Sequence, residues 1–227
     1  MLLYYITDRK QFPGTASDQE SELLCRIELA VAVGVDLIQL REKDLPAREL
    51  ERLAAQAKNL TRQSRTKLLI NSRLDVALAI DADGVHLTSH DLSASETRSI
   101  WAQATIATQI TQPIIAVSCH SIADVRLCES HGADLAVLAP VFEKVQAGVP
   151  GIGLEELRGA TRINGTPDRR IEAGDNRVGV PVLALGGVSL KNTAECIRAG
   201  AAGIAAIRLF QEGSLNETVR RLHELSC

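Results

Sequence analysis

Residues 181–210 of the sequence read PVLALGGVSLKNTAECIRAGAAGIAAIRLF. Two short apolar runs, at 181–187 and 203–210, flank a segment of helical character at 189–199. Alternation of short apolar runs with helical segments is typical of a parallel sheet whose strands are joined by crossover helices. Residues 181–210 therefore predict one strand–helix–strand unit of such a sheet.

The same alternation runs through the rest of the chain, and helical segments such as 17–33 and 46–60 separate the apolar runs. Eight strand–helix pairs in 227 residues favour the α/β class and a single (β/α)8 TIM barrel over an open doubly wound sheet. Residues 161–179, rich in Gly, Asn, Asp and Arg, interrupt this alternation and are predicted to be a surface insertion in a single domain spanning 1–227. The six other apolar runs are LLYYIT (2–7), VDLIQL (35–40), KLLIN (67–71), DGVHL (83–87), PIIAVSC (113–119) and DLAVLAPVF (134–142).

The composition is that of an ordinary globular chain and excludes several classes of function. Hydrophobic residues make up 45%, charged residues 23%, and the formal net charge is −3. This weakly acidic chain, with only 3% aromatic residues, offers no favourable surface to nucleic acid. No stretch approaches the roughly 18 to 20 apolar residues that cross a membrane, and the 5 cysteines form no C-x-x-C pair. We expect a cytoplasmic protein with reduced thiols and no membrane partner, either a monomer or a homo-oligomer.

Polar side chains follow the apolar runs, where TIM barrels place their active sites. At the end of the second run and just beyond it, Gln39, Arg41 and Lys43 alternate in sequence and are predicted to face the barrel mouth together. Two cations and an amide on one face can bind a phosphate or diphosphate. Glu42 and Asp44 offer the alternative of a salt-bridged strand end, in which these acids neutralise the cations.

Further polar residues follow the third, fourth and fifth runs. Asn71 ends the third run, Ser72 follows it, and Asp91 lies shortly after the fourth. A single carboxylate beside a phosphate site is compatible with Mg²⁺, which usually takes one or two carboxylates together with phosphate oxygens. His86 lies inside the fourth run and is predicted to be a packed, hydrogen-bonded histidine. His120 follows the fifth run and suits either acid–base catalysis or capping of the next helix.

A second phosphate-binding region is predicted where the last two runs end. Gly186 and Gly187 close the seventh run, and glycine lets backbone N–H groups approach phosphate oxygens closely. Ile207 and Arg208 close the eighth run and add a positive charge at the same place. The sequence therefore predicts one or two phosphorylated substrates across one barrel mouth.

Several of these runs together resemble the thiamine phosphate synthase and thiazole tautomerase superfamily in order and spacing: YYITDR, IQLREKDL, INSRLDVAL, ADGVHL, AVSCHS, GADLAVLAPVF and residues 184–207. The resemblance implies a TIM-barrel transferase of thiamine biosynthesis that joins hydroxymethylpyrimidine diphosphate to thiazole phosphate and releases diphosphate. It also implies Mg²⁺ as cofactor and small phosphorylated heterocycles as partners. The implied pyrimidine diphosphate contacts are Gln39, Arg41, Lys43, Asn71 and Ser118, and the implied thiazole phosphate contacts are Gly187, Ile207 and Arg208.

Three positions depart from the pattern of the family. Ser72 stands where the family has the first of two metal-binding aspartates, so we expect a Mg²⁺ site that rests on Asp91 and is weakened. Residues 143–147, EKVQA, stand where the synthases have a Pro-Thr-x-Thr-Lys run, and Lys144 and Gln146 are candidates to reach the same diphosphate. Arg208 stands where the family usually has Ser, so a different donor is expected at that phosphate.

These departures leave three functions open. The first is a synthase with an altered metal shell, in which Arg41, Lys43 and Lys144 carry the departure of diphosphate. The second is a thiazole tautomerase, which needs neither diphosphate nor metal and would use His120 for proton transfer. The third is a barrel that binds a thiamine precursor or product without converting it.

Overall fold

The computed structural model describes residues 1–105, 112–143, 148–162 and 179–225. Eight parallel strands close into one barrel in chain order, and β1 pairs with both β2 and β8. The predicted (β/α)8 TIM barrel is therefore confirmed. The strands are β1 (Leu2–Ile6), β2 (Leu37–Leu40), β3 (Lys67–Asn71), β4 (Gly84–Leu87), β5 (Ile114–Cys119), β6 (Leu135–Leu138), β7 (Val182–Leu185) and β8 (Gly203–Ala206).

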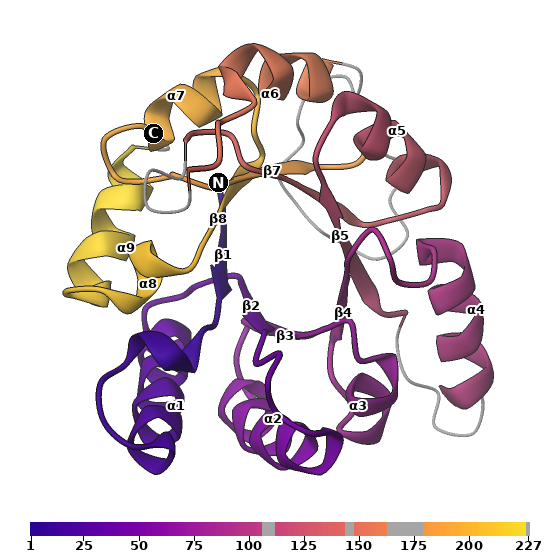
Figure 1. Cartoon of the computed structure of the whole chain (residues 1–227), viewed down its shortest axis with the longest axis vertical. Coiled ribbons are helices and arrows are strands. Elements are labelled where there is room, and N and C mark those ends of the chain that lie inside the picture. The colour runs from indigo at the N-terminus through magenta and orange to yellow at the C-terminus, as the bar shows by residue number, and fades with distance from the viewer. Residues whose placement is uncertain (106–111, 144–147, 163–178, 226–227) are drawn as a thin grey trace.

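Helices surround the barrel and cover the outer face of its strands (Figure 1). The short segments η1 and α8 follow β1 and β8 directly and lie at the same end of the barrel as the predicted site. The helices are η1 (Arg9–Gln11), α1 (Ala16–Ala32), α2 (Ala47–Thr61), α3 (Leu74–Ala79), α4 (Ala94–Thr105), α5 (Ile122–Ser130), α6 (Gly153–Arg162), α7 (Thr193–Arg198), α8 (Arg208–Gln211) and α9 (Leu215–Glu224).

Alternate residues of each strand point into the barrel or toward the helices. Leu37, Leu69 and Leu183 belong to an apolar cluster that fills the interior, whereas Ile38 and Ile70 pack in the cluster between strands and helices. This period of two follows from the pleat of the strands. It places the side chains two residues further along each strand, at the carboxyl end, on the rim of the barrel mouth.

One aromatic side chain interrupts an otherwise aliphatic barrel interior. Tyr4 is fully buried among aliphatic residues there, because its hydroxyl finds a hydrogen-bond partner in His86. The four cysteines in the described part of the chain are free thiols, and the sulfur atoms of Cys119 and Cys128 lie 3.7 Å apart. Reduced cysteines agree with the expectation from their spacing.

The predicted insertion at 161–179 lies mostly outside the described residues. Its first two residues complete helix α6, which ends at Arg162, and the chain is described again from Gly179. Within the described ranges, no helix has the length and apolar character needed to span a membrane.

Candidate active site

Gln39 and Asn71 occupy neighbouring positions at the mouth of the barrel. The Gln39 side chain is buried, and its Nε2 donates to Asn71 Oδ1 at 3.4 Å. Gln39 Oε1 is buried without a hydrogen-bond partner within the described part of the chain. Leaving a buried acceptor without a donor costs free energy, so this oxygen is prepared to accept a hydrogen bond from a ligand.

Ser72 and Asp91, the two predicted metal positions, contact each other directly. Ser72 Oγ accepts from Asn71 Nδ2 at 3.1 Å and donates to Asp91 Oδ2 at 2.8 Å. The Thr88 backbone N–H and hydroxyl donate to the same carboxylate oxygen at 2.6 and 2.9 Å. Asp91 Oδ2 therefore accepts three hydrogen bonds, and Oδ1 has no partner among the described residues.

A hydrogen-bonded chain of side chains crosses the barrel from β1 to β5. Tyr4 Oη lies 3.0 Å from His86 Nδ1, and His86 Nε2 lies 2.8 Å from Ser118 Oγ. The predicted role of His86 as a packed, hydrogen-bonded residue is confirmed. The Ser118 side chain thereby lies next to His86, and its contact with a pyrimidine stays a prediction.

The His86 imidazole is held neutral. Burial, helped by the positive charge of Arg41, lowers the pKa of His86 from 6.5 to about 3. A neutral imidazole has one donor and one acceptor nitrogen, and the buried Tyr4 hydroxyl is satisfied when it donates to Nδ1. His86 Nε2 then donates to Ser118 Oγ, which leaves the Ser118 proton for another acceptor.

The cations that follow β2 are not neutralised by the acids beside them in sequence. Arg9 forms ion pairs with Glu42 at 3.0 Å and with Asp44 at 2.7 Å. Neither Arg41 nor Lys43 has a side-chain hydrogen bond or ion pair with the described residues. The alternative in which Glu42 and Asp44 neutralise these two cations is therefore wrong.

The expectation of one shared strand face for Gln39, Arg41 and Lys43 is only partly met. Strand β2 ends at Leu40, so Arg41 and Lys43 lie in the loop that leads to α2. Gln39 is buried inside the barrel, Arg41 is half-buried and Lys43 is exposed. The strand ends early because Arg41 N donates to the Thr7 hydroxyl at 2.9 Å and not to a neighbouring strand.

His120 follows β5 at the rim and does not cap the next helix. The cap of α5 is Ser121, whose side chain accepts from Asp124 N, so capping by the His120 side chain is wrong. His120 Nδ1 lies 2.8 Å from the Ala139 carbonyl oxygen. Because a carbonyl oxygen only accepts, Nδ1 carries a proton, and in the neutral imidazole Nε2 is then the nitrogen with the unshared electron pair.

The predicted phosphate region after β7 is a glycine turn, in which the Asn192 side chain donates to Gly187 O at 3.0 Å. Gly186 and Gly187 have φ angles of +92° and +64°, and a Cβ on Gly187 would lie 2.7 Å from Phe142 Cβ. Phe142 N donates to Gly186 O at 3.0 Å, which ties the loops after β6 and β7 together. Ile207 is half-buried and contacts the interior cluster, and Arg208 is exposed at the start of α8.

Lys144 and Gln146, the candidates for the second diphosphate contact, lie outside the described residues.

The sequence of the chain is similar to thiamine-phosphate synthases over most of its length. The profile of the family described as thiamine monophosphate synthase matches residues 3–210. The chain belongs to this family. A Geobacter sulfurreducens protein, provisionally named a thiamine-phosphate synthase, is 38% identical over 210 residues, which are 90% of this chain and 84% of that protein. The thiamine-phosphate synthase of Caldanaerobacter subterraneus is 32% identical over 222 residues, covering 96% of this chain and 90% of the relative.

Solved structures place the chain in the same family. The thiamine phosphate pyrophosphorylase from Pyrococcus furiosus superposes with a TM-score of 0.76 at 28% identity, covering 99% of this chain and 94% of that one. The predicted transferase of thiamine biosynthesis is therefore confirmed as a member of the thiamine monophosphate synthase family.

The oxygen atoms of Ser72 and Asp91 fit Mg²⁺ only if other ligands complete the coordination shell of the ion. The described residues contain no group of three or more His, Cys, Asp or Glu side chains arranged to hold a metal ion. Asp91 Oδ1 and the Ser72 hydroxyl oxygen are the protein atoms that remain for a cation. Mg²⁺ can be held by one carboxylate when phosphate oxygens and water complete its shell.

Four residues of this family member gained a role only from the structure: Tyr4, Thr7, Arg9 and Glu42. Tyr4 lies within the first apolar run, Thr7 ends it and Arg9 follows it. The expectation that polar residues at the end of an apolar run lie at the barrel rim, which predicted Asn71, applies to Thr7 and Arg9 as well. Glu42 looked like a competitor of the cations and is instead a partner of Arg9.

Proposed function

We propose that this chain condenses hydroxymethylpyrimidine diphosphate with thiazole phosphate to give thiamine phosphate and diphosphate. The observation that carries the proposal is Gln39, whose buried Oε1 has no hydrogen-bond donor among the described residues and lies beside Asn71. The amino group of the pyrimidine is a donor that satisfies this oxygen. Ser118, held by His86, offers a further polar contact to the same ring.

Arg41 and Lys43 stabilise the departing diphosphate in this proposal. The bond between the pyrimidine methylene carbon and the diphosphate oxygen breaks, and the electron pair leaves with the diphosphate. The lone pair of the thiazole nitrogen then forms the new carbon–nitrogen bond. Such a reaction depends on positive charge around the leaving group more than on a protein nucleophile, and both cations lack a protein partner among the described residues.

Asp91 and Ser72 are the residues that would hold Mg²⁺ at this site. When bound, Mg²⁺ would supply positive charge against the leaving diphosphate. Because Ser72 brings no charge, Asp91 is the one carboxylate of the pair, and we expect weaker metal binding than a pair of aspartates gives. The glycine turn at Gly186 and Gly187, with Ile207 and Arg208, would bind the phosphate of the thiazole.

The direct test mixes the purified protein with both phosphorylated substrates and follows thiamine phosphate over a range of Mg²⁺ concentrations. We expect product, and we expect Ser72→Asp to reach half-maximal rate at about tenfold lower Mg²⁺ because it adds a second carboxylate. The backbone tolerates this change, since Ser72 has φ 59° and Asp adopts that region readily. Absence of product from both proteins at every Mg²⁺ concentration would overturn the proposal.

A thiazole tautomerase is a second candidate, which the geometry of His120 favours. His120 is exposed at the rim with Nδ1 bound to the Ala139 carbonyl oxygen, so in the neutral imidazole Nε2 is free to act as a general base. This reaction moves a proton within a thiazole carboxylate phosphate and needs neither diphosphate nor metal. The loss of a carboxylate at Ser72 would then be without consequence.

Two substrates separate the candidates. A tautomerase aromatises the thiazole without Mg²⁺, and His120→Ala lowers that rate by about a hundredfold. A synthase gives thiamine phosphate only with the pyrimidine diphosphate present. A His120→Ala protein that aromatises the thiazole at the full rate counts against the second candidate. A cytoplasmic location and a homo-oligomer stay predictions under either function.

A further inference from the structure

The loop that follows β2 presents cations and acids in strict alternation. Arg41, Glu42, Lys43 and Asp44 are consecutive, so each cation has a carboxylate beside it in the chain. Acids this close would compete with a bound diphosphate for the two cations, because opposite charges at short range attract one another. A site for diphosphate on this loop therefore needs another positively charged group that pairs with Glu42 and Asp44.

Arg9, in η1, forms ion pairs with both acids, Glu42 and Asp44. Its Nη1 lies 3.0 Å from Glu42 Oε2 and 2.7 Å from Asp44 Oδ1, and its Nη2 lies 2.7 Å from Asp44 Oδ2. The Arg9 backbone N–H also donates to the Glu42 carboxylate, at 3.1 Å to Oε2. Arg9 and Glu42 are buried, with exposed fractions of 6% and 4%. The planar guanidinium suits this task because it can bridge two carboxylates at once.

The ionisation of both acids reflects this contact. The hydrogen bonds from Arg9 hold the pKa of Asp44 well below its usual range. Burial raises the pKa of Glu42, and hydrogen bonds from Thr7 and Arg9 oppose that rise. Lys10 adds a second, exposed ion pair to Asp44 at 3.1 Å.

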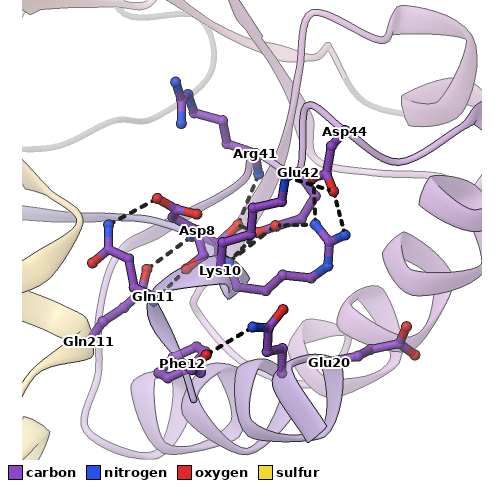
Figure 2. A network of polar contacts seen from close by, with 12 residues as sticks. Asp8, Lys10, Gln11, Phe12, Glu20, Arg41, Glu42, Asp44 and Gln211 are labelled. Atoms are coloured by element: carbon purple, nitrogen blue, oxygen red, sulfur yellow. Dashed lines mark hydrogen bonds and ion pairs between the residues drawn. The ribbon is translucent and has the colours of Figure 1, made fainter. Parts of the chain in front are cut away.

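Thr7 connects this cluster to Arg41. Its hydroxyl donates to Glu42 Oε1 at 2.7 Å and accepts from Arg41 N at 2.9 Å. The Arg41 backbone is thereby fixed next to the neutralised Glu42. Figure 2 shows the Arg41 side chain extending away from the carboxylates of Glu42 and Asp44.

We propose that Arg9 is a positioning residue that keeps Arg41 and Lys43 available to diphosphate by neutralising Glu42 and Asp44. The proposal rests on the proposed function, in which those two cations bind the diphosphate of the substrate. Arg9 itself does not contact the substrate. Its role is electrostatic, because its ion pairs keep the Glu42 and Asp44 carboxylates from pairing with Arg41 and Lys43.

The experiment measures binding of inorganic diphosphate, with Mg²⁺ at a fixed concentration, to the full chain by calorimetry. Arg9→Met is expected to weaken binding by about tenfold, because Glu42 and Asp44 turn toward the cations. The triple variant R9M/E42Q/D44N removes the competing charges as well and is expected to bind within about twofold of wild type. Lys10→Met, the matched control, removes an exposed ion pair to Asp44 and is expected to stay within about twofold.

The triple variant separates an electrostatic role from a structural one. If Arg9 only ties the loop in place, the triple variant lacks that tie too and binds as weakly as Arg9→Met, which would overturn the proposal. Where Arg9→Met does not fold, as judged by its circular dichroism, Arg9→Lys replaces it. Lys cannot bridge both acids, so a loss of about fivefold is expected, and adding E42Q/D44N restores the affinity.

Arg41→Met distinguishes the two proposals. If it binds diphosphate as tightly as wild type, the placement of the diphosphate is wrong, and the positioning role falls with it. If Arg41→Met loses affinity by about tenfold or more while Arg9→Met does not, the diphosphate site stands and the role of Arg9 is overturned.

Discussion

The two halves of the barrel mouth are built in different ways. From β1 to β5, side chains hydrogen-bond to one another, as in the contacts of Gln39 with Asn71 and of His86 with Ser118. From β6 to β8, the contacts of the glycine turn involve backbone groups: Phe142 N donates to Gly186 O at 3.0 Å, and Asn192 Nδ2 donates to Gly187 O at 3.0 Å. In the first half, the identity of the side chains determines the contacts. In the second half, the tight turn of the backbone at Gly186 and Gly187 determines them.

This difference explains which half tolerates substitution. A site made of backbone N–H groups keeps its donors when a neighbouring side chain changes, so we expect the proposed phosphate site to tolerate Arg208 where the family usually has Ser. A site made of side chains loses a specific contact with each replacement, so we expect Ser72 in place of Asp to weaken the proposed metal site directly. We therefore expect a mutation in the first half to change the kinetic constants for the pyrimidine diphosphate alone, and a mutation in the second half to change those for thiazole phosphate alone.

The largest effect is expected from Arg41→Met in the first half. Removing this cation from the leaving diphosphate should lower kcat/KM for the pyrimidine diphosphate by about a hundredfold, because its charge is needed as the bond breaks. The KM for thiazole phosphate should stay unchanged. Steady-state kinetics with each substrate varied in turn measures both values.

Arg52→Met is the matched control for that change. Arg52 of α2 forms an ion pair with Glu20 of α1, and the Arg52 side chain is exposed to solvent. Its loss should leave both KM values within about twofold, as expected for a surface pair. Equal losses for both substrates in Arg41→Met would contradict the division of the mouth into two halves.

The first half also shows how far the sequence predicts a site. Gln39, Asn71 and Asp91 were predicted because polar residues that follow apolar runs lie at the rim of a barrel. The contact of Arg9 with Glu42 was not, because it depends on how β1 lies beside β2, with Ile6 opposite Gln39. The spacing of residues in the chain does not show which side chains of two loops meet, so the sequence suggests only the neighbouring Arg41 and Lys43 as ion-pair partners of Glu42.

The fold itself was predictable because each strand and helix is marked locally by its own pattern. The boundary of β2 was less so, since alternation in sequence continues through Arg41 and Lys43 while the strand ends at Leu40. The hydroxyl of Thr7, the residue directly after β1, accepts a hydrogen bond from the Arg41 N–H that would have continued the ladder. Tertiary contacts of this kind decide where a strand ends.

A smaller effect is expected from Gly187→Ala in the second half. A Cβ there would lie 2.7 Å from Phe142 Cβ, so the turn must move and the phosphate donors move with it. The KM for thiazole phosphate should rise by about tenfold, while the KM for the pyrimidine diphosphate should not. Substrate-varied kinetics again provides the measurement.

Gly213→Ala is a close control for this change. Gly213 has φ 63°, nearly the same as Gly187, but a Cβ there meets nothing within 4 Å. Both variants carry the cost of alanine at positive φ, roughly 1 kcal/mol in stability, so their difference isolates the contact with Phe142. If Gly213→Ala raised the KM for thiazole phosphate equally, the close turn at Gly187 would not be what positions that phosphate.

The smallest effect is expected from the neutral histidine that supports the first half. The pKa of His86 is about 3 in the folded protein and near 6.5 when unfolded, so the unfolded chain binds more protons between these values. Stability is therefore full above about pH 6.5 and is lost as the pH falls. Between pH 7.5 and pH 6 the free energy of unfolding should drop by about 1 kcal/mol from this group alone.

Urea denaturation of wild type, His86→Gln and His90→Gln at both pH values isolates this contribution. His86→Gln should be less stable at pH 7.5, because the bonds to Tyr4 and Ser118 change, yet it should lose about 1 kcal/mol less on acidification. His90→Gln makes the same His-to-Gln exchange at an exposed position and is the control for the substitution itself. An equal pH dependence of stability in wild type and His86→Gln would mean that His86 is protonated inside the barrel. Both of its ring nitrogens would then be donors, and the hydrogen bond from Nε2 to Ser118 would not require Tyr4 to donate to Nδ1.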